Sequence, residues 1–400
     1  MPVTQTSLRI PEMEFRRRVQ RLQEHVEQEG LTGAVLFDPS YVLYYAGFAF
    51  IPTERPIAFL LSHKGEKALF VPRLELEHAR ANALVDRVDS YPEYPDDPHP
   101  MERLKAILQE LGIADPLGVD SDGYPWILGY RGPALSELLG VRVQNLRAFV
   151  EEQLRIKSPA EVACLRESAK WANLAHQLLQ RYTRVGATET EVSLRASTEA
   201  TLAMLDAIGP IYRAQSPWFS GARAGYRGQI GRSSAIPHAM ANNIRFQPGD
   251  VLVTGASAPV WGYHSELERT MIVGEPTPRQ KELFEHMLAL QETALEAIKP
   301  GARCADVDRA VRRYYEKHDL LPYWRHHTGH AIGLRYHEGP FLDVGDETVI
   351  EPGMVFTVEP GLYDPEVGGF RHSDTVVVTE TGIEVITFYP RDLESLTIPT

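Results

Sequence analysis

The sequence predicts an α+β protein with two domains, a smaller α/β domain over residues 1–153 and a larger domain over residues 154–400. Three observations support this prediction. Helical and strand patterns alternate along the first part of the chain. A capping signature from Ser158 to Glu161, with proline at the first helical position, then marks the start of a long helix. The later segments are rich in β-branched residues, and 400 residues suit two or three domains of ~150 residues each.

The smaller domain is expected to alternate helices and strands. Residues 11–30 carry apolar side chains at helical spacing and stop at Gly30, and residues 33–37 are a short buried-strand candidate. The apolar segments 57–62 and 67–72 flank a polar turn, which is typical of a β-hairpin. The other expected elements are helices near residues 101–111 and 133–139 and a strand at residues 117–120.

The larger domain is expected to open with helices and to continue with strands. Ser158, Thr188 and Thr277 are each followed three residues later by glutamate or glutamine, which is the pattern of a helix N-terminus. Strands are expected in four later segments, residues 250–256, 269–275, 354–360 and 374–380.

Composition excludes several classes of protein. The chain has 41 basic and 54 acidic residues and a net charge of −13, so nucleic acids and anionic membranes are poor partners. No window approaches the ~18 uninterrupted apolar residues of a spanning helix, and the N-terminus does not read as a signal peptide. Cys164 and Cys304 lie far apart and form no C-x-x-C pair, which argues against a disulfide scaffold and a thiolate zinc site. We therefore expect a cytoplasmic protein.

Three glutamates are candidates for chemistry in the larger domain. Glu266 and Glu268 precede an apolar strand, and the strand period of two would put them on one face. Two carboxylates on one face repel each other unless they bind a cation or share a proton. Glu359 lies inside VFTVEPGL, where burial requires a cationic or protonated partner. A solvated strand face is the alternative interpretation of the first pair.

Histidines and one arginine extend this set of candidates. The run HHTGHAIGLRYHEGP at residues 326–340 places His330 and His337 beside glycines, which allow a ligand to approach the backbone. Arg55 stands in the apolar segment IPTERPIAFLL and could hold a carboxylate with its planar fork. A packing role for His330 and an internal salt bridge for Arg55 are the alternatives.

Taken together, these motifs resemble the creatinase, aminopeptidase P and prolidase family, whose catalytic domain has the pita-bread fold. The resemblance begins near residue 11 and continues to the end of the chain. It rests on LRIKSPAEVACLRESA, PHAMANNIRFQPGD, GYHSELERT, TGHAIGLRYHEGP, EPGMVFTVEPGLY and FRHSDTVVVTETGIEVIT, in that order. It implies a C-terminal pita-bread domain preceded by a smaller α/β domain of the creatinase N-terminal type, and a homodimer.

The resemblance also implies a departure at the metal site. Peptidases of this family hold two metal ions with five ligands, Asp, Asp, His, Glu and Glu. The matching positions in this chain are Gly255, Glu266, His330, Glu359 and Ser373. Glycine supplies no ligand, and serine lacks the carboxylate that bridges two ions. We therefore expect no metal cofactor; the alternative is one divalent ion on Glu266, His330 and Glu359.

Several residues resemble creatinase, the metal-free branch of the family. The stretch IKPGARCADVDRAVRRYYEKHDLL and the LERT sequence with Glu268 match it, and His238 stands where the catalytic histidine of creatinase does. Arg55 matches an arginine that binds the substrate carboxylate. Creatinase has alanine in place of Glu266 and an arginine near the place of His337. This chain is therefore expected to be a relative that acts on another small substrate.

The expected function is hydrolysis of a C–N bond without a metal. The substrate would be a small molecule with a carboxylate and a cationic amine, guanidinium or amidine group. His238 would take a proton from water and return it to the leaving nitrogen. Glu268 and Glu359 would hold the cationic group. Glu266 would add negative charge, act as a second base or act as a nucleophile.

The other expected roles are in binding. His330 and His337 would donate hydrogen bonds to developing negative charge, and Arg55 would hold the carboxylate. One alternative is an Xaa-Pro dipeptidase or aminopeptidase with a reduced metal site, acting on a dipeptide. The other is a catalytically dead pita-bread domain used for binding, against which the retained His238 and Glu359 argue.

Overall fold

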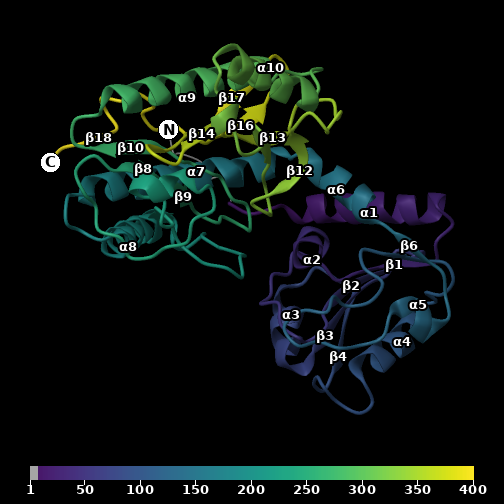
Figure 1. The fold of residues 1–400 in the computed structure, drawn as a ribbon. Helices are drawn as coiled ribbons and strands as arrows, with labels where there is room; N and C mark the ends of the chain where they lie inside the picture. Colours follow the sequence, from purple (N-terminus) through teal and green to yellow (C-terminus); the bar gives the residue numbers. More distant parts are fainter. Residues whose placement is uncertain (1–7) are drawn as a thin grey trace, which may run out of the picture. The chain divides into compact units, whose positions relative to one another are not determined.

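The computed structural model describes residues 8–400, which form two compact units (Figure 1). The N-terminal unit comprises residues 10–154, and the four residues Gln215–Trp218 group with it. The C-terminal unit comprises residues 155–214 and 219–400. The sequence predicts a division between residues 153 and 154.

A six-stranded mixed sheet forms the centre of the N-terminal unit, in the order β4-β3-β2-β1-β5-β6. Strands β1, β2 and β3 pair antiparallel, and the expected hairpin joins β2 to β3 with Leu61 opposite Lys67. The outer pairs are parallel. The strands are β1 Gly33–Leu36, β2 Ala58–Ser62, β3 Lys67–Pro72, β4 Arg87–Tyr91, β5 Leu117–Val119 and β6 Val143–Asn145.

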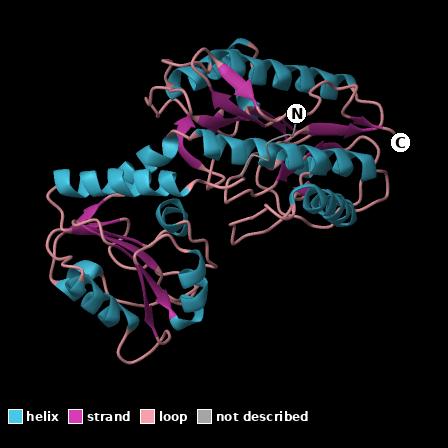
Figure 2. Cartoon of the chain, turned by 180° about the vertical axis from the view of Figure 1, so that it is seen from behind, coloured by secondary structure: helices cyan, strands magenta, loops and turns pink. Residues whose placement is uncertain are grey.

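Helices surround this sheet, as Figure 2 shows. They are α1 Glu12–Gln28, α2 Pro39–Ala46, α3 Leu76–Asn82, α4 Pro100–Glu110, α5 Leu135–Leu139 and α6 Arg147–Arg155. Every residue of β1 and β2 is buried, and α4 contributes Leu104 and Ile107 to the same core. The helices predicted at residues 11–30, 101–111 and 133–139 are present, the last of them shorter than expected.

Two helix pairs enclose the strands of the C-terminal unit (Figures 1 and 2). The helices are α7 Pro159–Tyr182, α8 Glu189–Ile208, α9 Pro278–Ala297 and α10 Cys304–Lys317. Three of them begin at the predicted caps. Ser158 and Thr277 form complete capping boxes, and the Thr188 side chain accepts a hydrogen bond from the Glu191 amide.

Ser158→Ala is expected to lower the free energy of unfolding by about 1 kcal/mol. The Ser158 hydroxyl accepts from the Glu161 amide at 3.3 Å, and the Glu161 carboxylate accepts from the Ser158 amide at 2.6 Å. Alanine leaves one of these donors without its partner at a buried helix end. Urea unfolding measures the change, and Ser158→Thr, which keeps the hydroxyl, should retain most of the stability.

The strands of the C-terminal unit form several small sheets. The two larger sheets have the orders β18-β10-β8 and β12-β11-β13-β16-β17, and β14 pairs with β15 and β7 with β9. These strands are β7 Arg223–Gly225, β8 Val251–Val253, β9 Gly255–Ser257, β10 Thr270–Val273, β11 Gly329–Ala331, β12 Glu338–Leu342, β13 Val355–Val358, β14 Gly361–Asp364, β15 Gly368–Arg371, β16 Asp374–Val378, β17 Ile383–Val385 and β18 Thr397–Ile398.

One predicted strand is divided in the structure. The segment 250–256 breaks into β8 and β9 at Thr254, whose hydroxyl donates to the Arg269 carbonyl and accepts from the Arg269 amide. The Thr254 amide also donates to the Arg269 carbonyl, so the side chain adds to the backbone pairing at the point where the strand breaks. Glu266 and Glu268 lie in no named strand, although Glu268 forms an isolated antiparallel bridge with Ser373.

No helix within residues 8–400 is both long and apolar enough to cross a membrane.

Candidate active site

Three side chains of the C-terminal unit form a cluster that could hold a metal ion. His330 lies in β11, Glu359 follows β13 directly, and Glu266 lies between β9 and β10. One ligand atom from each lies within 4.8 Å of the others. These are the three residues that the sequence assigns to a single-ion alternative.

His330 is oriented by its neighbours. Its Nδ1 lies 2.9 Å from the Ala331 carbonyl, so we assign the Nδ1 proton to that hydrogen bond. Its backbone amide donates to the Thr357 hydroxyl. Its ring stacks on the His337 ring, with 3.9 Å between the ring centroids. The buried Nε2 lies 3.1 Å from Glu359 Oε1 but has no well-aligned hydrogen-bond partner in the described chain. This nitrogen is therefore free to take a proton or a cation.

The pKa values in the cluster depend on each other. Burial and the charges of Glu359 and Glu268 raise the pKa of Glu266 to about 8. Burial lowers the pKa of His330, but the carboxylates of Glu359 and Glu266 outweigh it and raise the pKa to about 9. Burial raises the pKa of Glu359, but His330 and Arg371 bring it below its ordinary range. These directions favour a protonated His330 beside an ionised Glu359, and they make Glu266 harder to ionise than a free carboxyl group.

A second group of charges lies beside the cluster, around Glu268. Arg371 Nε donates to Glu268 Oε2 at 2.5 Å, and Arg227 Nη2 donates to Glu268 Oε1 at 2.8 Å. The Arg371 and Glu268 side chains are 3% and 4% exposed. Arg371 Nε also lies 3.8 Å from Glu359 Oε2 and links the two groups. Arg227 has a positive φ of 52°, a rare conformation for a residue other than glycine.

At the two positions that the resemblance assigns to missing metal ligands, Gly255 lies against the Glu268–Arg227 pair and Ser373 supplies a hydroxyl. A Cβ atom at Gly255 would meet Glu268 Oε1 at 3.6 Å and Arg227 Nε at 4.0 Å. The Ser373 hydroxyl donates to Glu266 Oε1 at 2.8 Å. The residues present therefore fit one divalent ion on Glu266, His330 and Glu359, and they do not fit a pair of ions.

A pocket of about 400 Å³ opens onto this site. Its walls include Glu266, Glu268 and His337, together with residues of the β7–β9 pair. Burial and the positive charge of His330 lower the pKa of His337 to about 4, so its ring is neutral at physiological pH. The pocket suits a small molecule, and both carboxyl and guanidinium groups line it.

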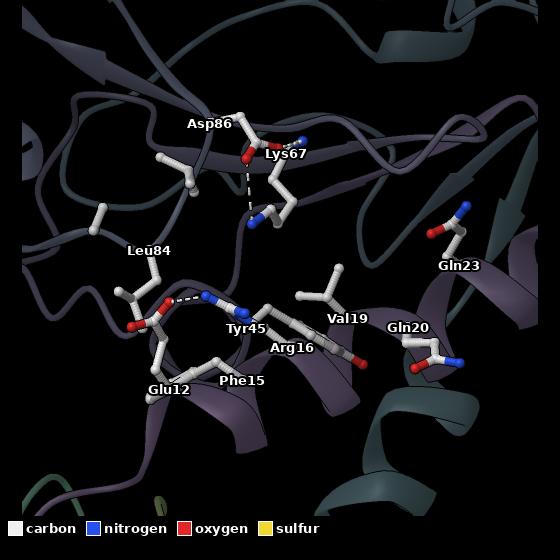
Figure 3. Close-up of a pocket in the computed structure, with 12 residues that line it drawn as sticks. Glu12, Phe15, Arg16, Val19, Gln20, Gln23, Tyr45, Lys67, Leu84 and Asp86 are labelled. Carbon is white, nitrogen blue, oxygen red and sulfur yellow. Dashed lines mark hydrogen bonds and ion pairs between the residues drawn. The ribbon is translucent and has the colours of Figure 1, made fainter.

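A second pocket, of about 500 Å³, lies in the N-terminal unit beside α1 (Figure 3). Its charged side chains pair with each other, Arg16 with Glu12 at 2.6 Å and Lys67 with Asp86 at 3.4 Å. No histidine or cysteine lines this pocket within the described part of the chain. Its carboxylates are held in these ion pairs, and nothing in its lining resembles the histidine–carboxylate cluster of the first site.

His238 and Arg55 lie apart from the cluster. His238 is exposed just after a short 3-10 turn, and its charge contributes to the low pKa of His337. Arg55 belongs to the N-terminal unit, where Nε donates to Glu93 Oε1 at 2.6 Å and Nη1 to Glu54 Oε1 at 2.5 Å. The internal salt bridge left open by the sequence is thus formed, and the substrate role of Arg55 stays a prediction.

Arg55→Lys tests that role. If Arg55 holds the substrate carboxylate, the change should raise KM with little effect on kcat, because lysine lacks the planar fork. Steady-state kinetics measures both values. An unchanged KM would mean that Arg55 does not bind the substrate and only forms ion pairs with Glu54 and Glu93. These pairs are partly exposed and contribute little to the free energy of unfolding.

Sequence reasoning missed the two arginines of the site. Arg371 stands in the quoted FRHSDTVVV motif, two residues before Ser373, so alternation along the strand could have indicated it. Arg227 meets Glu268 across 41 positions in sequence, and no local pattern signals that contact.

Comparison with known proteins defines the family. Residues 163–380 match the model of metallopeptidase family M24, and residues 18–156 match that of the Creatinase/Prolidase N-terminal domain. The chain therefore belongs to family M24 and is a hydrolase. The predicted family, the pita-bread C-terminal domain and the creatinase-type N-terminal domain are confirmed.

The most similar proteins include several named for one activity. An Xaa-Pro dipeptidase of Pyrococcus furiosus is 28% identical over 95% of this chain and 100% of its own length. The structure of an Xaa-Pro dipeptidase from Bacillus anthracis has a TM-score of 0.80 and 27% identity, covering 96% of this chain and all of that chain. Dipeptidase PepE from Mycobacterium ulcerans has a TM-score of 0.80 and 28% identity over 98% of this chain and all of its own.

These relatives change which of the functions expected from the sequence is favoured. They favour the Xaa-Pro peptidase alternative over the creatinase-like, metal-independent function. The family, together with the Glu266, His330 and Glu359 group, also favours a divalent ion over the metal-free site that the sequence predicts.

Proposed function

We propose that this chain hydrolyses a C–N bond in a small substrate that carries a cationic nitrogen and a carboxylate, at a site with room for no more than one divalent ion. The observation that carries the proposal is the replacement of two family ligands by Gly255 and Ser373, with arginines beside them. Without a bridging carboxylate, the activation of water rests more heavily on the side chains of the chain itself.

Each side chain has a role in this proposal. His238 takes a proton from the attacking water and returns it to the leaving nitrogen. The sequence assigns the cationic group to Glu268 and Glu359, but Glu268 already pairs with Arg371 and Arg227, so ionised Glu266 and Glu359 hold that group here. Ionised Glu266 is also placed to act as a second base or as a nucleophile. Protonated His330 donates a hydrogen bond to negative charge that develops on the substrate. His337 contacts the substrate at the edge of the pocket.

Two substrate classes satisfy this description. Xaa-Pro dipeptides carry a cationic amine and a carboxylate, and the names of the relatives favour them. Guanidino or amidino acids are the creatinase-like choice, and the loss of the second ion site favours them. An ion on Glu266, His330 and Glu359 would polarise a carbonyl or a water molecule. Hydrolysis assays with Xaa-Pro dipeptides and with guanidino and amidino acids distinguish the two classes.

Metal content is the most direct test of the site. We expect no more than one divalent ion per purified chain, because two of the five family ligands are absent. Elemental analysis gives the stoichiometry, and assays after chelation show whether an ion is needed. Activity that survives chelation would support the metal-independent mechanism. Activity that is lost and then restored by one ion would support an Xaa-Pro peptidase with a reduced site, and two bound ions would contradict the limit.

Other properties stay predictions within this proposal. A homodimer is expected from the family resemblance, and light scattering of the purified chain tests it. A cytoplasmic location is also an expectation from the sequence, in which Cys164 and Cys304 lie far apart; both side chains are buried. A catalytically dead binding domain would show no turnover with either substrate class.

A further inference from the structure

One guanidinium in the active-site pocket has no acidic partner. Arg223 and Arg227 both line the pocket, but Arg227 donates to Glu268 at 2.8 Å. Arg223 is exposed and forms no ion pair with any residue between 8 and 400. Its positive charge therefore remains available for a ligand.

Strand β7, which pairs with β9, carries this guanidinium in the pocket wall. Arg223 and Gly225 are two residues apart and so lie on the same face of β7. Their partners on β9 are Ser257 and Gly255. Gly225 lies opposite Gly255 on the neighbouring strand. Gly255 is next to Glu268 and Arg227, and Arg223 is two residues from Gly225, a rise of about 7 Å along a strand.

An aromatic ring packs against one face of the Arg223 guanidinium and orients it. The Arg223 Cζ atom lies 4.3 Å from the centroid of the Phe219 ring, which also lines the pocket. Stacking uses the face of the guanidinium and leaves its in-plane N–H groups free. A carboxylate accepts two parallel hydrogen bonds from that edge. The stacked arrangement thus reduces the entropy lost when a carboxylate binds.

We propose that Arg223, held by Phe219, binds the substrate carboxylate, while the Glu266 end of the same pocket binds the cationic nitrogen. The pocket then selects small zwitterions whose two charges lie several ångströms apart. This inference rests on the proposed function, because it names the residue that recognises one half of the proposed substrate. It assigns the carboxylate to the C-terminal unit, whereas the sequence assigns it to Arg55.

Pairs of probes that differ only at the carboxylate test the proposal. The probes are Ala-Pro and its C-terminal amide, and 4-guanidinobutyrate and its amide. Ligand-observed NMR on the full chain gives the dissociation constants, and the same spectra show hydrolysis. We expect the unmodified chain to bind at least one acid about 10–100-fold more tightly than its amide, the range for a hydrogen-bonded charge.

Variants assign the effect to a residue. Arg223→Met should reduce the preference for the acid to about twofold or less, and Arg223→Lys should keep part of it. Arg184→Met is the matched control, because Arg184 is exposed in the same unit and pairs only with Glu191 at 3.3 Å. It should keep the full preference, and thermal melting should show that all three variants are folded.

Several outcomes would overturn the inference. These are equal binding of acid and amide by the unmodified chain, no binding of any probe at about 10 mM, or a full preference retained in Arg223→Met. Loss of the preference in Arg55→Ala but not in Arg223→Met would return the role to Arg55. A preference that depends on Arg223 without hydrolysis of any probe would support the inference and count against the proposed function, so the two failures are distinguishable.

Discussion

His238→Asn should reduce kcat by about 10²–10⁴-fold, the usual range for loss of a general acid–base group. His238 is exposed, and its charge is one of the contributions that lower the pKa of His337 in the pocket wall, which agrees with a proton-transfer role for His238 near this pocket. Asparagine keeps the size and hydrogen bonding of the side chain but cannot exchange a proton near neutral pH.

Stability provides the control for this variant. Because His238 is exposed, His238→Asn should change the free energy of unfolding by less than about 0.5 kcal/mol. His63→Asn, an exposed histidine of the N-terminal unit, should leave kcat unchanged. Turnover of His238→Asn close to that of the unmodified chain, on the substrate found by the hydrolysis assays, would remove His238 from the mechanism.

Glu268→Gln should lower the free energy of unfolding by about 3 kcal/mol, at the lower end of the cost of breaking a buried ion pair. The change leaves the Arg371 guanidinium, 3% exposed, without its carboxylate at 2.5 Å. Glu359, at 3.8 Å, offsets part of the loss, and the half-exposed Arg227 can turn to water. Urea unfolding measures the difference.

Two further variants separate burial from charge pairing. Glu384→Gln breaks an exposed pair with Arg166 and should cost less than about 1 kcal/mol. The double variant Glu268→Gln with Arg371→Met removes both charges and should recover part of the stability. A cost for Glu268→Gln no larger than that for Glu384→Gln would contradict a buried ion pair.

Local signals in the sequence were sufficient for much of the fold. The caps at Ser158 and Thr277 act over three residues, and the β2–β3 hairpin follows from its apolar segments and polar turn. Such interactions depend on neighbours in sequence, so a single chain reveals them. The break of the predicted strand at Thr254 depends on Arg269, fifteen residues away, and could not be seen locally.

The same distinction applies to the candidate site. Glu266, His330 and Glu359 were found because each lies in a motif, and the structure brings them together. The environment of Glu268 depends on Arg371 and Arg227, which are distant in sequence. Sequence spacing carries no information on which of several carboxylates a buried cation will meet.

The guanidinium groups around Glu268 have a consequence for how this site is supplied with positive charge. A metal ion exchanges with its surroundings, so its occupancy follows the free concentration of that ion and of its competitors. Arg371 and Arg227 are part of the polypeptide, so their positive charges cannot dissociate from it. That side of the site is therefore complete as soon as the chain has folded, and neither scarcity of an ion nor insertion of a wrong one can alter its charge.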